Sequence, residues 1–155
     1  MIPTHVVTLN GEMNIPVLDA DGPPSNEIVG YLSRLDGDDL FAVALWKLPE
    51  GHSLGTPEAN RASDENYLQS AGSATAMTIE LRASTGSAGG QYGVGRGSHS
   101  RGETPDTHIV FGRHTVSVFS DEVFTADEAA PIYRHYFETG AVPDGLTLRP
   151  LELGL

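Results

Sequence analysis

Six histidines and 21 acidic residues are the side chains of this sequence that could carry out acid–base or metal chemistry. His108 and His114 could share a metal across a hairpin, but the sequence offers no evident third ligand. Asp36, Asp38 and Asp39 are three carboxylates within four residues and could gather Ca²⁺ or Mg²⁺. Their spacing lacks the full calcium-loop pattern and its distal Glu. We therefore expect no metal site.

Two other stretches only partly match sites of catalysis or nucleotide binding. Ser98-His99-Ser100 has no acid at a defined spacing that would orient the imidazole. Residues 93–97, Gly-Val-Gly-Arg-Gly, lack the Gly-Lys-Ser/Thr ending of a phosphate loop, and no helical pattern follows to supply a dipole. The short motifs of zinc peptidases, α/β-hydrolases and β-lactamases are also absent. The sequence therefore predicts no catalytic residues and no cofactor.

Charge and composition limit the class of protein and the kind of partner. The chain of 155 residues has the length of one domain, and 39% of it is hydrophobic. Its net charge is −12, which repels phosphate backbones and disfavours direct nucleic-acid binding, but suits a basic protein partner. There is no cysteine, no run of about 20 apolar residues and no signal-peptide pattern. We expect a cytoplasmic protein that does not enter the membrane.

The hydrophobic periodicity predicts an α+β domain. Alternating apolar residues indicate strands at 4–9, 14–18, 77–83, 91–94, 108–111, 114–119 and 146–148, and an apolar run indicates a central strand at 40–48. A helical pattern covers 25–35. Residues 49–76 are polar and contain a long stretch without clear periodicity, which predicts a long loop or insertion. We expect an antiparallel sheet of five to seven strands with two helices packed on one face.

The second of these helices, at 127–139, has the strongest local signals. Thr125 and Glu128 are spaced as a capping box, and Gly140 followed by Pro143 predicts a sharp end. Phe137 belongs to its apolar face. Because a proline in the helix interior costs roughly 3 kcal/mol, we expect Pro131 to lie in an irregular or opening turn.

The C-terminal residues, 120–155, resemble a known family in this helix, its glycine stop and the strand that follows. The matching residues are Val123, Phe124, Thr125, Ala129, Ala130, Tyr136, Phe137, Thr139, Gly140, Pro143, Leu146 and Thr147. A looser pattern of strands and glycines extends back to Met77. These features are similar to the first-numbered family of bacterial polymorphic-toxin immunity proteins, although Leu148 stands where that family usually has Trp. The resemblance implies stoichiometric neutralisation of a cognate toxin, most often of the deaminase superfamily, by occlusion of its active site and without a cofactor.

Exposed acidic residues are the predicted contacts for such a toxin. They are Asp36, Asp38 and Asp39 in one turn, with Asp64, Glu65, Glu103 and Asp106 in loops. Tyr92 and Arg96 of the glycine-rich stretch are an alternative contact surface. Two other functional classes stay open: a small metal- or ligand-binding enzyme, favoured if a pocket gathers His108, His114 and a carboxylate, and a structural subunit of a homo-oligomer.

Overall fold

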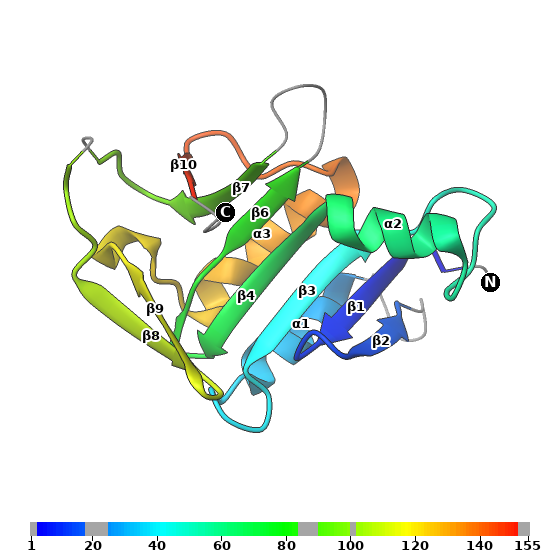
Figure 1. Ribbon diagram of the computed structural model, residues 1–155, viewed down its shortest axis with the longest axis horizontal. Helices are drawn as coiled ribbons and strands as arrows, with labels where there is room; N and C mark the ends of the chain where they lie inside the picture. Colours follow the sequence, from blue (N-terminus) through cyan, green and yellow to red (C-terminus); the bar gives the residue numbers. More distant parts are fainter. Residues whose placement is uncertain (1–2, 18–24, 84–89, 100–101, 152–155) are drawn as a thin grey trace.

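The computed structural model describes residues 3–17, 25–83, 90–99 and 102–151 (Figure 1). In this part of the chain, eight strands form one antiparallel sheet in the order β10-β7-β6-β4-β3-β1-β2, with β5 paired to β4, and β8 and β9 form a separate hairpin. The strands are β1 (His5–Leu9), β2 (Met13–Pro16), β3 (Ala42–Lys47), β4 (Tyr67–Ser73), β5 (Ala76–Met77), β6 (Glu80–Ala83), β7 (Gly90–Gly95), β8 (Thr107–Phe111), β9 (His114–Val118) and β10 (Thr147–Pro150). The helices are α1 (Ser25–Arg34), α2 (Pro57–Glu65) and α3 (Ala126–Thr139), with a 3-10 turn at Ser120–Glu122.

Strand β3 lies in the middle of the sheet, between β1 and β4, as its apolar sequence predicts. Its side chains alternate between two apolar environments. Val43 and Leu45 belong to the main core, whereas Trp46 packs on the opposite face with Val6 and Ala59. The sheet is therefore buried on one face along its length and covered on the other face only in part.

Helices α1 and α3 lie side by side on one face of the sheet, behind the strands in the view of Figure 1. Ile28 and Leu32 of α1 and Tyr133 of α3 are fully buried there. The Tyr133 hydroxyl forms a hydrogen bond of 2.8 Å with Ser70 of β4, so the helix is tied to the sheet by a polar contact as well as by packing. The predicted α+β class, with an antiparallel sheet and two helices on one face, is confirmed.

The segment 49–76, predicted as a long loop or an insertion, is not a loop throughout, because it contains helix α2 and strand β4. Thr56 caps α2 by accepting a hydrogen bond from the backbone N–H of Ala59, and Pro57 occupies its first turn. Ala59 is the buried residue of α2, so the helix has no apolar stripe to detect. In β4 the small residues Ala71 and Gly72 are buried, and a Cβ at Gly72 would collide with the carbonyl of Ala76. Leu68 is the large side chain that β4 buries, and the close approach of another backbone explains its glycine at position 72.

Helix α3 has the predicted ends but not the predicted position of its proline. The Thr125–Glu128 capping box is present, and Gly140 ends the helix in the left-handed conformation, with φ of 77°. Because the cap places the first helical residue at Ala126, Pro131 lies inside the helix and not in its opening turn. Proline has no backbone N–H, so the helix lacks one hydrogen-bond donor at this position, and the ring itself is exposed. Phe137 is half-buried, so its expected place in the core is only partly met.

The remaining strand predictions differ from the structure mainly at their ends. The predicted strand 77–83 is divided into β5 and β6, and the hairpin β8–β9 turns at Gly112 with φ of 64°. Residue 18 of the predicted strand 14–18 and residue 100 of the Ser-His-Ser motif lie outside the described residues.

Candidate binding face

The face of the sheet opposite α1 and α3 is open between two elements that lie over its ends. Figure 1 looks onto this face, with α2 across one end and the β8–β9 hairpin across the other. Helix α2 contacts β3, and β8 contacts β4. The strands between them present polar and small side chains, so this part of the sheet is open to a partner in the described structure.

A hollow of about 270 Å³ lies on this face between α2 and the β1–β2 turn. Ala42 and Ala44 of β3 contribute short side chains to its floor, and Thr8 and Trp46 complete the floor. The Trp46 indole N–H donates a hydrogen bond of 2.9 Å to the Thr8 hydroxyl, so these two side chains are fixed before any partner arrives. The alanines therefore leave room for the hollow, and the Trp46–Thr8 contact holds its floor in place.

The rim of the hollow is acidic. Glu12 from the β1–β2 turn and Asp64 from the last turn of α2 both line it, and both side chains are exposed. Among the described residues, no Lys or Arg lines it. Two carboxylates around a preformed floor suit a guanidinium or ammonium group.

The predicted acidic turn at 36–39 lies next to this rim. The Asn10 side chain, beside Gly11 of the hollow, donates a hydrogen bond of 2.8 Å to the Asp39 carbonyl. Within the turn, Asp36 accepts hydrogen bonds from the backbone N–H groups of Asp38 and Leu40. These hydrogen bonds hold the turn in shape, and they also lower the pKa of the Asp36 carboxyl. The exposed Asp38 and Asp39 side chains remain available for a partner.

A polar network continues the face from the hollow toward β10. Tyr67 donates to Gln91, whose amide donates to Glu80 at 2.7 Å. Burial raises the pKa of the Glu80 carboxyl. Beyond it, Arg149 makes a bidentate contact of 2.8 and 2.9 Å with the buried carboxylate of Glu122. These side chains satisfy one another and stabilise the sheet edge.

The Glu122 carboxylate also fixes the 3-10 turn, because it accepts a hydrogen bond of 2.9 Å from the Phe119 backbone N–H. The Phe119 ring contacts both the His99 ring and the Arg149 guanidinium. The His99 ring stacks on it with centroids 3.5 Å apart, and the Arg149 guanidinium lies 5.2 Å from its centroid. This arrangement attaches the segment before β8 to the sheet.

His99 has the orienting acids that the sequence does not reveal. Its Nε2 atom lies 2.8 Å from Asp121, and its Nδ1 atom lies 3.0 Å from Glu103. Asp121 is 22 residues away in sequence, so no local spacing could indicate the pair. The hydrogen bond to Asp121, with a smaller contribution from Glu103, raises the pKa of His99. Both ring nitrogens are occupied by carboxylates, an arrangement that holds a charged imidazolium and leaves no nitrogen to activate a hydroxyl.

His108 and His114 do not form a shared site. The strand register pairs His108 with Ser117 and His114 with Phe111, which places the two imidazoles on opposite faces of the hairpin. The His108 Nδ1 atom lies 3.0 Å from the Ser117 hydroxyl. A pocket that gathers these two histidines with a carboxylate is incompatible with this register.

The predicted toxin-contact residues fall in different places. Asp64 lines the hollow, the exposed Glu65 follows it at the end of α2, and Asp38 and Asp39 lie near its rim, whereas Glu103 is engaged with His99. Asp106 is exposed at the start of the hairpin. In the alternative surface, Arg96 is exposed but engaged within the protein. Its guanidinium lies 4.4 Å from the centre of the Phe124 ring and donates to the Val123 carbonyl, and the Tyr92 side chain is half-buried.

Glu12 and the alanines of the floor are the functional candidates that sequence reasoning missed. Glu12 directly follows the Asn10-Gly11 turn, whose two residues have positive φ values of 53° and 70°. That turn is recognisable in the sequence, but the hollow that Glu12 shares with Asp64 of α2 is not.

Comparison of the sequence with models of protein families and with curated proteins finds no match. In the described part of the chain, no helix has the length and apolar character needed to cross a membrane.

Proposed function

We propose that this protein binds a basic toxin domain with the open face of its sheet and neutralises it by occluding its active site. The observation that carries the proposal is the acid-rimmed hollow, with Glu12 and Asp64 around a preformed floor and no cation among the described residues that line it. The similarity of residues 123–147 to an immunity family of polymorphic-toxin systems supports the choice of partner.

The charge of the protein fits a toxin that acts on nucleic acid. Such a toxin needs a basic groove to hold phosphates, and a protein of net charge −12 is attracted to that groove. We expect an arginine or lysine of the toxin to enter the hollow between Glu12 and Asp64. A deaminase domain is the toxin class that the family resemblance favours. Inhibition needs no turnover, because a standard interface of roughly 1,600 Å² excludes a substrate from the covered surface.

The neighbouring reading frame supplies the test. A toxin domain encoded beside this gene is produced in cells with and without the protein, and binding is measured on the purified pair. Glu12→Gln with Asp64→Asn is expected to weaken binding by about tenfold or more, because charge-assisted hydrogen bonds contribute about 1.5–3 kcal/mol each. Asp127→Asn with Glu138→Gln removes the same charge from the exposed side of α3 and serves as the matched control.

Unchanged growth protection and unchanged affinity in the Glu12/Asp64 variant would exclude the hollow as the contact. Equal losses in both double variants would mean that only the net charge matters. Failure of the wild-type protein to protect against the neighbouring toxin would reject the function itself.

A further inference from the structure

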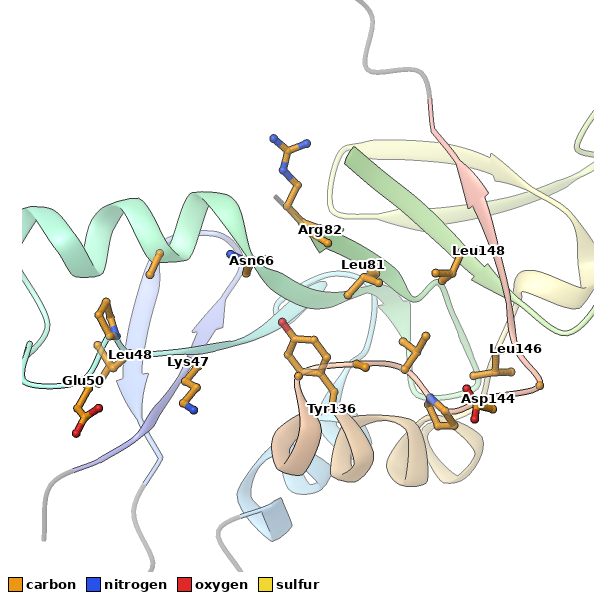
Figure 2. Close-up of a pocket in the computed structure, with 18 residues that line it drawn as sticks. Lys47, Leu48, Glu50, Asn66, Leu81, Arg82, Tyr136, Asp144, Leu146 and Leu148 are labelled. Atoms are coloured by element: carbon orange, nitrogen blue, oxygen red, sulfur yellow. The ribbon is translucent and has the colours of Figure 1, made fainter. Parts of the chain in front are cut away.

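Charge distinguishes the acidic hollow, which Glu12 and Asp64 rim, from a larger hollow at the end of α3. The larger hollow has a volume of about 780 Å³ (Figure 2). The two cations of its lining are matched by two carboxylates, and Figure 2 shows Arg82 pointing away from Tyr136. Of these two hollows, only the acidic one has an excess of charge in its described lining. How firmly its carboxylates are held therefore matters for the proposed contact.

Glu12 belongs to the β1–β2 turn, in which Asn10 has an unusual backbone conformation. Asn10 and Gly11 occupy the central positions of this turn with positive φ values, and the Glu12 N–H donates a hydrogen bond of 3.0 Å to the Leu9 carbonyl. In the described part of the chain, Asn10 is the one residue other than glycine with positive φ. Asparagine tolerates this conformation better than most residues, because its short side chain can form local hydrogen bonds.

The Asn10 side chain ties this turn to the start of β3 and to the acidic turn. Its Oδ1 atom accepts hydrogen bonds from the backbone N–H groups of Phe41 at 2.9 Å and Ala42 at 3.2 Å. Its Nδ2 atom donates a hydrogen bond of 2.8 Å to the Asp39 carbonyl. Ala42 lines the hollow. One amide therefore fixes the turn that carries Glu12 against the hollow and against the acidic turn.

The second acid of the hollow is held by different contacts. Asp64 lies in the last turn of α2, which is capped by Thr56 and packs through Ala59 against Trp46. The hydrogen bonds of the Asn10 side chain go to residues 39, 41 and 42, outside α2. The two carboxylates of the hollow are thus positioned separately, one by a turn and one by a helix.

We propose that Asn10 is a positioning residue of the binding face, which sets the place of Glu12 by holding the β1–β2 turn against β3. This inference rests on the proposed function, in which Glu12 contacts a cation of the partner. A carboxylate that is held before contact loses less conformational freedom on binding. The loss of the Asn10 amide should therefore speed dissociation of the partner. It should leave association nearly unchanged, because the charge of the face is unchanged.

The first measurement needs no partner. Asn10→Gly keeps a residue suited to positive φ and removes the amide, whereas Asn10→Asp keeps the acceptor for the two N–H groups of β3 and loses the donor to Asp39. In Asn10→Gly, hydrogen exchange at the Phe41 and Ala42 amides is expected to be about tenfold faster. In Asn10→Asp, these amides should stay protected. Nitrogen-15 relaxation should show a more mobile Glu12 backbone in Asn10→Gly than in the wild type.

The second measurement is binding kinetics with the toxin domain of the neighbouring reading frame. Asn10→Gly is expected to dissociate about tenfold faster than the wild type. In double-mutant cycles it should add little to Glu12→Gln, because the acid that it places is already gone, and should add fully to Asp64→Asn. Phe137→Ala lowers stability from the other face of the sheet and is the control for a general loss of stability, with wild-type binding expected.

Asn10→Asp separates position from charge. It adds a carboxylate to the face, so an effect of charge alone would leave binding equal or tighter. The new carboxylate oxygen repels the Asp39 carbonyl in place of the donor, so a positioning role predicts binding that is about threefold weaker.

The positioning role is overturned if exchange and Glu12 mobility do not change in Asn10→Gly. It is also overturned if Asn10→Gly dissociates like the wild type or no faster than Phe137→Ala, if its effect adds fully to that of Glu12→Gln, or if Asn10→Asp binds more tightly. A wild-type protein that does not bind the neighbouring toxin rejects the proposed function instead. The exchange and relaxation measurements then decide whether Asn10 places Glu12.

Discussion

His5 and His99 show how the same side chain acquires opposite electrostatic properties in one small protein. His5 lies in β1, where its ring stacks on Phe137 with centroids 4.0 Å apart. Burial, with a smaller effect of Lys47, lowers its pKa to about 4. His99 lies between two carboxylates, which raise its pKa. The two residues therefore make the free energy of unfolding depend on pH in opposite directions.

We expect His5 to destabilise the protein as the pH falls from about 6.5 toward 4. In this range the imidazole of the unfolded chain binds a proton and the buried imidazole does not, because its folded pKa is about 4. The free energy of unfolding should fall by up to about 1.4 kcal/mol per pH unit through this group alone. Urea unfolding between pH 7 and 4.5 measures it, with His5→Asn as the comparison. Parallel pH profiles for wild type and variant would show that His5 titrates normally.

His99 should have the opposite effect. Because its folded pKa is raised above the unfolded value, its stabilisation is fully present below about pH 6.5 and is lost as the pH rises through the folded pKa. The gap in unfolding free energy between wild type and His99→Gln should therefore shrink from pH 6 to pH 9. NMR titration of the His99 ring locates the folded pKa directly. A ring that titrates at its ordinary value would contradict the contacts with Asp121 and Glu103.

At the scale of elements, the parts with local signals could be predicted and the parts created by packing could not. The capping box of α3, the glycine after it and the apolar run of β3 are each readable within a short window of sequence. Helix α2 buries a single alanine, and β4 contains Gly72 where another backbone comes close, so neither has a hydrophobic period. One side of the acidic hollow is formed by α2, which explains why Asp64 was predicted as an exposed acid but its place in one hollow with Glu12 was not.

Two aromatic residues of α3 should differ in their contribution to stability. Tyr133 is fully buried and its hydroxyl contacts the buried Ser70, so Tyr133→Phe should cost about 1–3 kcal/mol by leaving Ser70 without its partner. Phe137 is only half-buried, so Phe137→Ala should cost about 2 kcal/mol, below the 3–5 kcal/mol typical of a fully buried Phe. Chemical unfolding of both variants tests this. A loss for Phe137→Ala above about 4 kcal/mol would mean that this ring is a core residue.

At the scale of the whole molecule, the two faces of the sheet are covered to different extents. The face under α1 and α3 holds the main core, which includes Val7, Leu45 and Leu68. The other face is covered only at its ends, and its carboxylates lie on turns and on the end of α2. A net charge of −12 weakens the compact state by self-repulsion, and a basic partner on the proposed binding face would reduce that repulsion.

The acidic side chains near the hollow should also act before contact, by attracting a basic partner. Asp38, Asp39 and Glu65 are exposed near the hollow, outside its lining, so they should steer the toxin domain toward it without fixing it there. Neutralising them as Asp38→Asn, Asp39→Asn and Glu65→Gln should slow association several-fold at low salt and leave dissociation nearly unchanged. The difference should vanish near 1 M salt, where the screening length falls from about 10 Å at 0.1 M to about 3 Å. Asp36 is left intact because its carboxylate holds the turn.

Stopped-flow binding at several salt concentrations measures this effect, and neutralisation of Glu103 and Asp106 provides a second acidic cluster for comparison. Because Glu103 is paired with His99, and neither it nor Asp106 lines the hollow, this second variant should change the association rate less. If both variants slow association equally, the attraction is a property of the net charge, and the open face has no privileged part in the encounter. If neither does, the acidic surface serves solubility, and the toxin must be recognised by uncharged contacts.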